Sequence, residues 1–221
     1  SNKRSSLDFD VRHSGFGNED ELQKPFGGTI KGIIDNIDYI KNLGCTAIWL
    51  SPVFENNPHS YHGYAIQNYL DVDQRWGTKK DLERLVDKAH KLDIRVFLDV
   101  VLHHSGDNWS YPFDYDYYYA NGERFPLGDW REKDRPLPIE LRDPELYNRK
   151  GQIRNFDKYP ETQEGDFLTL KTFRNDGSPE SEKLGKLLAA IHCYWIRETD
   201  VDGFRLDAVK HMKGQDISRF C

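Results

Sequence analysis

The feature that most constrains the fold of this chain is an alternation of short, nearly continuous apolar runs with longer segments in which apolar residues recur at helical spacing. The apolar runs are Cys45–Leu50 and Ile94–Leu102, and a further strand is expected at Val201–Leu206, directly after the last helical segment. The helical segments lie at about 30–40, 82–89 and 184–195. Strands that are apolar throughout are typical of a parallel sheet covered by helices, because both sides of each strand are then buried. The sequence therefore predicts an α/β fold with a parallel sheet.

Local signals mark where two of the helices begin and add one strand. Thr29 is a suitable N-cap for the helix at 30–40. Thr78-Lys79-Lys80-Asp81 resembles a capping box with Asp in place of Glu, which predicts the start of the next helix. The segment Leu7–Val11 could supply a strand before the first helix. We therefore expect about four β/α units.

The stretch from about 105 to 178 breaks this alternation. It has few aliphatic runs, many Gly, Pro, Asp and Asn residues, and many aromatic residues. We interpret it as a subdomain inserted after the third strand. Most of its rings are expected to form its own core, whereas Trp109 and Tyr111 are the best candidates to face a cleft. Its glutamates are expected on a solvated surface: Glu140, Glu145, Glu161 and Glu164.

Composition excludes several classes of function. The chain has 31 Lys and Arg against 37 Asp and Glu, a net charge of −6, and no basic stripe, which argues against nucleic acid as a partner. No apolar run approaches the ~20 residues that span a bilayer, and the polar start is not a signal peptide. Cys45, Cys193 and Cys221 have no metal-ligand spacing and are expected to be buried free thiols. Free thiols favour the cytoplasm, provided that no targeting segment has been removed.

Polar residues stand at the ends of the predicted strands, where parallel α/β folds place their working groups. His62-Gly63-Tyr64 follows the second strand, Asp99 and His104 close the third, and Arg205 and Asp207 close the fourth. Arg205 and Asp207 are two positions apart, so both side chains point to one face, where the guanidinium would stabilise the ionised carboxylate. Taken alone, the pair fits an oriented nucleophile and an internal ion pair equally well.

Three motifs in order give the chain a family resemblance. They are Tyr61-His62-Gly63-Tyr64, Asp99-Val100-Val101-Leu102-His103-His104 and Gly203-Phe204-Arg205-Leu206-Asp207-Ala208-Val209-Lys210-His211. Together they resemble the α-amylase family, glycoside hydrolase family 13, over nearly the whole chain. The resemblance implies the first half of a (β/α)8 TIM-type barrel with a domain B inserted after the third strand. Residues 1–104 would hold barrel strands 1–3 with helices 1–2, residues 105–178 domain B, and residues 179–221 helix 3, strand 4 and the start of the following segment.

The resemblance also implies that Asp207 is a nucleophile that forms a covalent glycosyl-enzyme intermediate, held ionised by Arg205. Family members retain the anomeric configuration with two carboxyl groups about 5–5.5 Å apart, a nucleophile and an acid/base. The family's acid/base Glu ends the fifth strand, whereas this chain stops soon after Asp207. We therefore interpret the chain as part of a retaining α-glucan hydrolase that is inactive alone. A transglycosylase, a disaccharide-active relative and a non-catalytic interaction subunit are the alternatives.

The resemblance assigns substrate binding to the remaining polar residues, with Tyr64 as the stacking platform. The set is His62, Tyr64, Asp99, His104, Lys210 and His211. Exo-acting relatives commonly carry an Asp directly after that tyrosine, where this chain has Ala65, so cleavage of internal α-1,4 bonds is expected.

The resemblance further bears on metals and partners. Many amylases bind calcium through an Asn at the position of His103, and imidazole is a poor calcium ligand, so we expect no calcium and no other cofactor. An α-glucan or maltooligosaccharide is the expected partner. Unpaired edges of a half barrel predict self-association.

Overall fold

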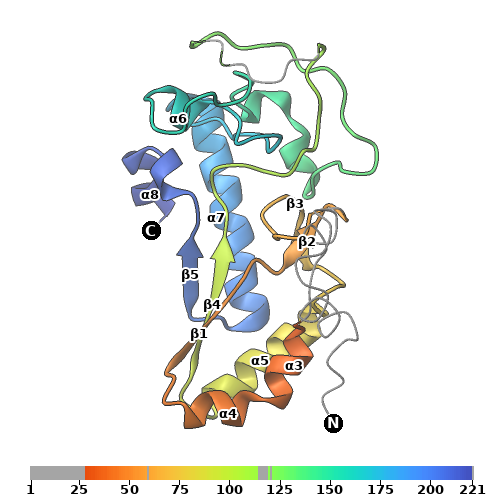
Figure 1. Ribbon diagram of the computed structural model, residues 1–221, viewed down its shortest axis with the longest axis vertical. Helices are drawn as coiled ribbons and strands as arrows, with labels where there is room; N and C mark the ends of the chain where they lie inside the picture. The colour runs from red at the N-terminus through yellow and green to blue at the C-terminus, as the bar shows by residue number, and fades with distance from the viewer. Residues whose placement is uncertain (1–27, 59, 114–118, 120, 221) are drawn as a thin grey trace, which may run out of the picture.

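The computed structural model describes residues 28–58, 60–113, 119 and 121–220 (Figure 1). A parallel sheet of three strands lies at the centre of this part of the chain. Its order is β1 (Ala47–Leu50), β4 (Arg95–Val100) and β5 (Gly203–Leu206). The parallel α/β arrangement predicted from the apolar runs is confirmed. The earlier strand expected at Leu7–Val11 lies outside the described residues.

Two long helices pack in one hydrophobic core with this sheet (Figure 1). α5 (Lys79–His90) begins with the predicted capping box, in which Thr78 and Asp81 each satisfy the other's backbone N–H. α7 (Pro179–Thr199) begins at Ser178, whose side chain accepts a backbone N–H. On this covered face the residues of the central strand β4 are fully buried: Val96, Leu98 and Val100.

The opposite side of the sheet differs from the prediction that every strand is buried on both faces. We call it the open face, and its members are Trp49, Phe97, Asp99 and Arg205. Trp49 is 57% exposed. In the described chain, β1 pairs only with β4 and is an edge strand. An apolar run alone does not distinguish such a strand from one that is covered on both sides.

The helix predicted at 30–40 is two short helices, α3 (Ile30–Asp35) and α4 (Ile37–Asn42). The break lies at Asn36, whose side-chain amide donates to the Gly32 carbonyl at 2.8 Å. In a continuous helix that carbonyl would accept the Asn36 backbone N–H, which instead bonds to the Ile33 carbonyl at 3.0 Å. Competition by this side chain interrupts the helix while the apolar stripe continues. Thr29 caps α3 as predicted.

A short antiparallel hairpin, β2 (Phe54–Asn56) and β3 (Ile66–Val72), follows β1. No strand was predicted from the sequence in this region. The pairing register shifts on both sides of Glu55, so the regular pairing of a hairpin is interrupted. The loop between the two strands carries His62 and Tyr64, and the hairpin therefore determines where these side chains lie.

The segment between β4 and α7 has little regular structure. It contains η1 (Ile139–Arg142), η2 (Pro144–Leu146) and α6 (Glu161–Glu164). Trp109 is fully buried there, with its ring edge-on to Tyr111 and Tyr147 at centroid distances of 4.8 and 5.8 Å. The Tyr111 hydroxyl donates to Asp166 at 2.8 Å. The prediction that Trp109 faces a cleft is wrong, because Trp109 is fully buried in the segment's own core. Tyr111 is partly buried against that core, and its place at a cleft stays a prediction.

The two ends of this segment lie together. The Ser105 N–H donates to the Lys171 carbonyl at 3.0 Å, and the Gly106 N–H donates to the Ile66 carbonyl of β3 at 2.9 Å. A Cβ at Gly106 would lie 3.0 Å from the carbonyl oxygens of Ala65 and Ile66. The close approach between the segment and the hairpin therefore favours glycine at this position.

Two further predictions, about the burial of Glu161 and of Cys193, are wrong. Glu161 is buried rather than solvated, and its carboxylate accepts the Asn155 N–H at 3.1 Å. Cys193 is exposed and Cys45 is partly buried, and both are free thiols, so the expectation of buried thiols is wrong for Cys193. Among the described helices, none is long and apolar enough to cross a membrane.

Candidate active site

The carboxyl ends of β4 and β5 bring three charged side chains together. Asp99 and Arg205 are register partners on neighbouring parallel strands, and Asp207 follows Arg205 two positions later. The Arg205 Nη1 donates to both carboxylate oxygens of Asp99 at 3.1 Å and to Asp207 Oδ1 at 2.6 Å. We call this arrangement the Arg205 bridge. The predicted contact between Arg205 and Asp207 is present.

Asp99 is the buried carboxylate of the Arg205 bridge. Its Oδ2 also accepts hydrogen bonds from the Tyr64 hydroxyl at 3.3 Å and from the Trp49 indole N–H at 3.2 Å. Burial raises the pKa of Asp99 above its usual value, and the Arg205 guanidinium opposes that rise. Asp207 is partly exposed, so it is the carboxylate that a ligand can reach.

The chain turns sharply directly after Asp207. Ala208 has a φ of +56°, a left-handed conformation that costs energy in any residue with a side chain unless the surroundings enforce it. The turn leads into η3 (Val209–His211). The Asp207 N–H still bonds to the Val100 carbonyl at 2.9 Å. The sheet therefore fixes the backbone of Asp207, and the following residues leave the sheet at once.

His62 and Tyr64 come from the loop between β2 and β3. Gly63 between them has a φ of +84°, and a Cβ there would lie 3.0 Å from the Pro52 carbonyl oxygen, so glycine is required. The Gly63 carbonyl accepts the Asn56 side-chain amide at 2.8 Å, which ties the loop to β2. The Tyr64 ring is thereby held at the sheet's carboxyl edge, with the His62 ring stacked on it at a centroid distance of 5.8 Å.

The tautomer of His62 follows from its hydrogen bonds. Its Nδ1 accepts the Tyr64 backbone N–H at 3.0 Å. Burial lowers the pKa of His62, so the ring is neutral at pH 7 and its proton lies on Nε2. Nε2 is 3.4 Å from the Ser60 hydroxyl. His62 therefore offers a neutral N–H donor rather than a positive charge.

Three imidazole rings, those of His103, His104 and His211, lie beside one another. The Nδ1 atoms of His103 and His104 are 3.1 Å apart, and the His103 and His211 ring centroids are 5.6 Å apart. Burial lowers the pKa of His104 to about 4 and that of His103 well below its usual value. The Phe167 ring stacks on His104, with centroids 5.9 Å apart. His211 Nδ1 donates to the Thr162 carbonyl at 2.7 Å, which links η3 to α6.

The structure therefore unites most of the predicted site residues, in three different ways. Direct hydrogen bonds join Tyr64, Asp99, Arg205 and Asp207. His62 stacks on Tyr64, while His104 and His211 both contact His103. Lys210 differs from the rest. Its Nζ bonds to the exposed Asp157 carboxylate at 2.6 Å, so its described partner lies in the segment between β4 and α7.

Sequence reasoning missed Trp49 and Phe167. Trp49 belongs to an apolar run and was assigned to a buried strand, yet the Arg205 Cζ lies 4.8 Å from its ring centroid. Trp49 is the last residue but one of its strand, as Asp99 and Arg205 are of theirs, and this shared position was a usable signal. Phe167 gave no such signal, because its contact with His104 depends on the fold of an irregular segment.

The surroundings of His103 do not fit a calcium ion. Calcium takes oxygen ligands, whereas the described ring contacts of His103 are the imidazoles of His104 and His211. The buried Asp166 is a carboxylate of the neighbouring segment, and both of its oxygens already accept hydrogen bonds, one of them the Thr172 N–H at 2.9 Å. In the part of the chain that the structure describes, no group of three His, Cys, Asp or Glu side chains is arranged to hold a metal ion.

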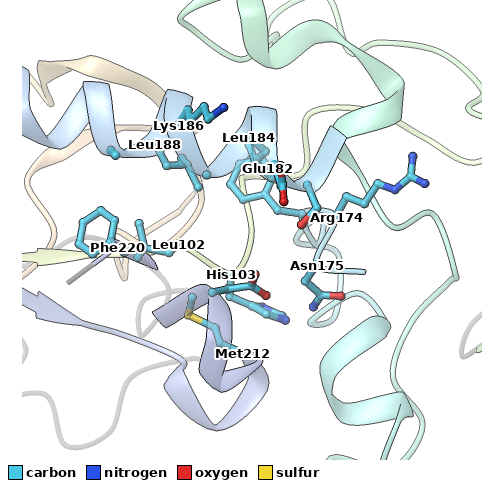
Figure 2. A pocket seen from close by; sticks show the side chains of 15 residues that line it. Leu102, His103, Arg174, Asn175, Glu182, Leu184, Lys186, Leu188, Met212 and Phe220 are labelled. Carbon is cyan, nitrogen blue, oxygen red and sulfur yellow. The ribbon is translucent and has the colours of Figure 1, made fainter. Parts of the chain in front are cut away.

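A separate cavity of about 400 Å³ lies between α7, α8 (Gly214–Phe220) and the chain around His103 and Arg174 (Figure 2). Its lining is mostly apolar and includes Leu188, Met212 and Phe220, with His103 in one wall. Neither carboxylate of the Arg205 bridge lines it. The cavity is therefore distinct from the charged group at the strand ends.

Comparison with protein families and curated proteins gives consistent matches. A family model described as the α-amylase catalytic domain matches residues 5–219. The chain is 33% identical to an α-amylase of Streptomyces lividans, over 84% of this chain and 24% of that protein. It is 34% identical to a cyclomaltodextrinase of a Bacillus species, over 86% of this chain and 30% of that protein. The chain thus spans about a quarter to a third of the length of these relatives.

Solved structures give the same result. An α-amylase from Geobacillus thermoleovorans in complex with acarbose matches with a TM-score of 0.70 and 32% identity, over 92% of this chain and 39% of that one. An α-amylase from Anoxybacillus matches with a TM-score of 0.71 and 31% identity, over 97% of this chain and 40% of that one. These neighbours have the TIM-barrel fold.

Proposed function

Because the chain belongs to the α-amylase family of glycoside hydrolases, as the match over residues 5–219 shows, we propose that it carries the nucleophile of a retaining α-glucan hydrolase. The observation that carries this proposal is the Arg205 bridge. Its arginine contacts a buried carboxylate, Asp99, and a partly exposed one, Asp207, at the carboxyl ends of parallel strands. That position is where barrel enzymes place catalytic groups.

In the proposed reaction an Asp207 carboxylate oxygen attacks the anomeric carbon of a bound glucosyl unit, and the bond from that carbon to the glycosidic oxygen breaks. The departing oxygen takes a proton from a carboxylic acid that the family resemblance places after a fifth barrel strand. Water then hydrolyses the glycosyl-enzyme bond, and the configuration is retained. Arg205 holds Asp207 ionised and oriented before the attack.

The neighbouring residues supply contacts for the sugar. The apolar face of a pyranose packs on an aromatic ring, and Tyr64 offers such a ring beside the Arg205 bridge. His62 offers a neutral Nε2–H donor at the same edge. The substrate of the proposed enzyme is an α-1,4-glucan or a maltooligosaccharide, in line with the acarbose complex of the Geobacillus thermoleovorans relative.

The proposed cleavage is at internal bonds. Ala65, which follows Tyr64, is buried and uncharged, so this position provides no carboxylate to close the pocket against a longer chain. An enzyme that contains this chain should cut a long maltooligosaccharide whose ends are blocked. Failure to cut it, with release of glucose from unblocked substrate, would contradict this part of the proposal.

The proposed architecture is the first half of a TIM-type barrel, residues 1–104 and 179–221, with residues 105–178 as domain B. The proximity of the segment's two ends at Ser105 and Lys171 supports the proposal, because an insertion must leave and re-enter at one place. In the described chain, β1 and β5 each pair only with β4, and Trp49 is exposed on the open face. We therefore expect the isolated chain to self-associate. A strictly monomeric chain in light scattering would argue against this.

The proposal includes no calcium beside His103, because the side chain that the described residues place in hydrogen-bond contact with it is another imidazole, that of His104. Thermal unfolding should be the same in calcium and in chelator. A calcium-dependent rise in Tm that His103→Leu abolishes would contradict this part.

A fluorinated glucosyl fluoride tests the nucleophile in the absence of the acid, because fluoride departs without protonation. We expect 5-fluoro-α-D-glucosyl fluoride to label the 221-residue chain at Asp207, as read by mass spectrometry of its peptides, and not to label Asp207→Asn. Asp35→Asn, on the exposed surface of α3, is the matched control and should label like the wild type. An unlabelled wild type, or labelling at another residue, would contradict the proposal.

The same chain should not release reducing sugar from maltooligosaccharides. Their leaving group is an alkoxide, and a general acid typically contributes about 10²–10⁴-fold to such a step. In the described part of the chain, the carboxylates at the carboxyl ends of the parallel strands are those of the Arg205 bridge. Hydrolysis at the rate of an ordinary amylase would show that another group donates the proton.

A further inference from the structure

The open face carries an aromatic residue that the proposed reaction does not use. Trp49 and Phe97 are register partners on β1 and β4. Phe97 and Asp99 lie two positions apart, and Asp99 is the register partner of Arg205 on β5. All four side chains therefore lie on the same side of the sheet. Trp49 reaches toward the Arg205 bridge from the strand farthest from Arg205.

The Trp49 side chain makes two directed contacts. Its Nε1–H donates to Asp99 Oδ2 at 3.2 Å. The Arg205 Cζ lies 4.8 Å from the ring centroid, within the range of a cation–π interaction. Trp49 is nevertheless 57% exposed. Within this chain, the contacts with both members of an ion pair therefore account for its orientation.

These contacts affect how Arg205 distributes its hydrogen bonds. Its Nη1 lies within 3.1 Å of three carboxylate oxygens, two on Asp99 and one on Asp207. A guanidinium Nη atom carries only two hydrogens, so the two carboxylates compete for them. Trp49 gives Asp99 Oδ2 a separate donor, and the Tyr64 hydroxyl gives it another. Each of these donors reduces the demand of Asp99 on Arg205.

We propose that Trp49 is a positioning residue whose indole N–H holds Asp99 and whose ring supports the guanidinium, so that Arg205 stays directed at Asp207. The inference rests on the proposed function, because it concerns the orientation of the proposed nucleophile. Trp49 acts only through Asp99 and Arg205 and does not touch the reacting atoms.

Two substitutions separate the two contacts. Trp49→Phe keeps a ring beneath the guanidinium and removes the N–H donor, whereas Trp49→Leu removes both. Trp130→Phe is the matched control, because Trp130 lies in the segment between β4 and α7 and packs edge-on to Tyr147 at a centroid distance of 6.0 Å. The readout is the rate at which 5-fluoro-α-D-glucosyl fluoride labels Asp207 across a range of pH.

We expect labelling near pH 7 to be roughly 10-fold slower in Trp49→Phe, the loss typical of one hydrogen bond to a charged group. Trp49→Leu should be slower again, because the cation–π contact is lost as well. Trp130→Phe should label like the wild type. Equal rates for the wild type and both Trp49 variants would overturn the inference and leave the proposed function intact.

The pH dependence of the labelling rate distinguishes a positioning role of Trp49 from a merely structural one. The Trp49 N–H favours the ionised form of Asp99, so Trp49→Phe should raise the pKa of Asp99 and move the acidic limb of the labelling profile to higher pH. Carbon-13 NMR of the Asp99 carboxylate measures the same change without any substrate. If the wild type is not labelled, the proposed function fails. The NMR titration then still decides the inference, since an unchanged Asp99 pKa in Trp49→Phe overturns it and a raised one supports it.

Discussion

The two faces of the three-stranded sheet use neighbouring residues of the same strands for different purposes. On β4, Val96 and Leu98 point to the covered face and are fully buried under the helices. Phe97 lies between them and Asp99 directly follows Leu98, and both point to the open face together with Arg205. Since side chains alternate along a strand, one short sequence supplies both a core and a charged site. A substitution on the covered face should therefore mainly change the stability of the fold, and one on the open face should mainly change the reactivity of Asp207.

The largest expected effect is on the open face. Arg205→Met removes the only cation of the Arg205 bridge among the described residues, so labelling of Asp207 should fall by about 10²–10³-fold, as for the loss of other groups that stabilise developing charge. Asp99 can take up a proton, because its pKa is already raised by burial, so the fold should be retained. Labelling at the wild-type rate would show that the arginine does not prepare Asp207.

On the covered face the expected effect is on stability. Leu98→Ala should lower the free energy of unfolding by about 2–5 kcal/mol, because it leaves a cavity in a close-packed core. Urea unfolding measures the loss, and labelling measured where the variant is still folded should stay close to that of the wild type. Leu43→Ala is the control, since Leu43 is 62% exposed and should change stability by less than about 0.5 kcal/mol. A large loss of labelling in folded Leu98→Ala would show that the two faces are coupled.

A smaller effect is expected on how the free energy of unfolding depends on pH. Burial lowers the pKa of His192 on α7 to about 4, so between about pH 6.5 and pH 4 the unfolded chain binds a proton that the folded chain does not. The stability that neutral His192 contributes is therefore fully present above about pH 6.5 and is lost as the pH falls from there through about 4. His104 acts in the same direction, while the buried Asp166, whose pKa is raised to about 6, acts in the opposite one.

His192→Leu should therefore reduce the loss of stability between pH 7 and pH 5, as measured by urea unfolding at each pH. His90→Leu is the control, because His90 is partly exposed and bonds to Asp202 on the surface. An equally steep decline in His192→Leu would mean that His192 does not contribute to the acid sensitivity of the core.

The elements that the sequence predicted correctly are those fixed by local rules. α5 follows from the capping box at Thr78 and Asp81 together with an apolar stripe. β4 follows from a nearly continuous apolar run, and β5 from the short segment that comes directly after the third helical stripe. The break at Asn36 was not predictable from the apolar pattern, because a side-chain hydrogen bond to Gly32 causes it. The hairpin was missed because its register shifts at Glu55.

The candidate site was likewise predictable only where local rules fix it. The spacing of Arg205 and Asp207 along one strand placed them together, and the structure agrees. The contact between Asp99 and Arg205 was not predicted, because it depends on the register between two strands that are far apart in the sequence. The role of Trp49 was not predictable, because an apolar run does not reveal which of its residues lies beside an ion pair.

The closure of the segment between Ser105 and Lys171 has a consequence for how such a molecule can be modified. The two residues form a narrow neck, and Gly106 beside it fits closely against the hairpin. A replacement for residues 107–170 must bring its two ends within hydrogen-bonding distance, and the entropic cost of closing a longer loop rises slowly with its length. A graft at this neck would exchange the rim that contains Phe167 and leave the strands that hold Asp99 and Arg205 unchanged. Under the proposed function, the residues that select the substrate and the residues that carry out the reaction can therefore be exchanged independently.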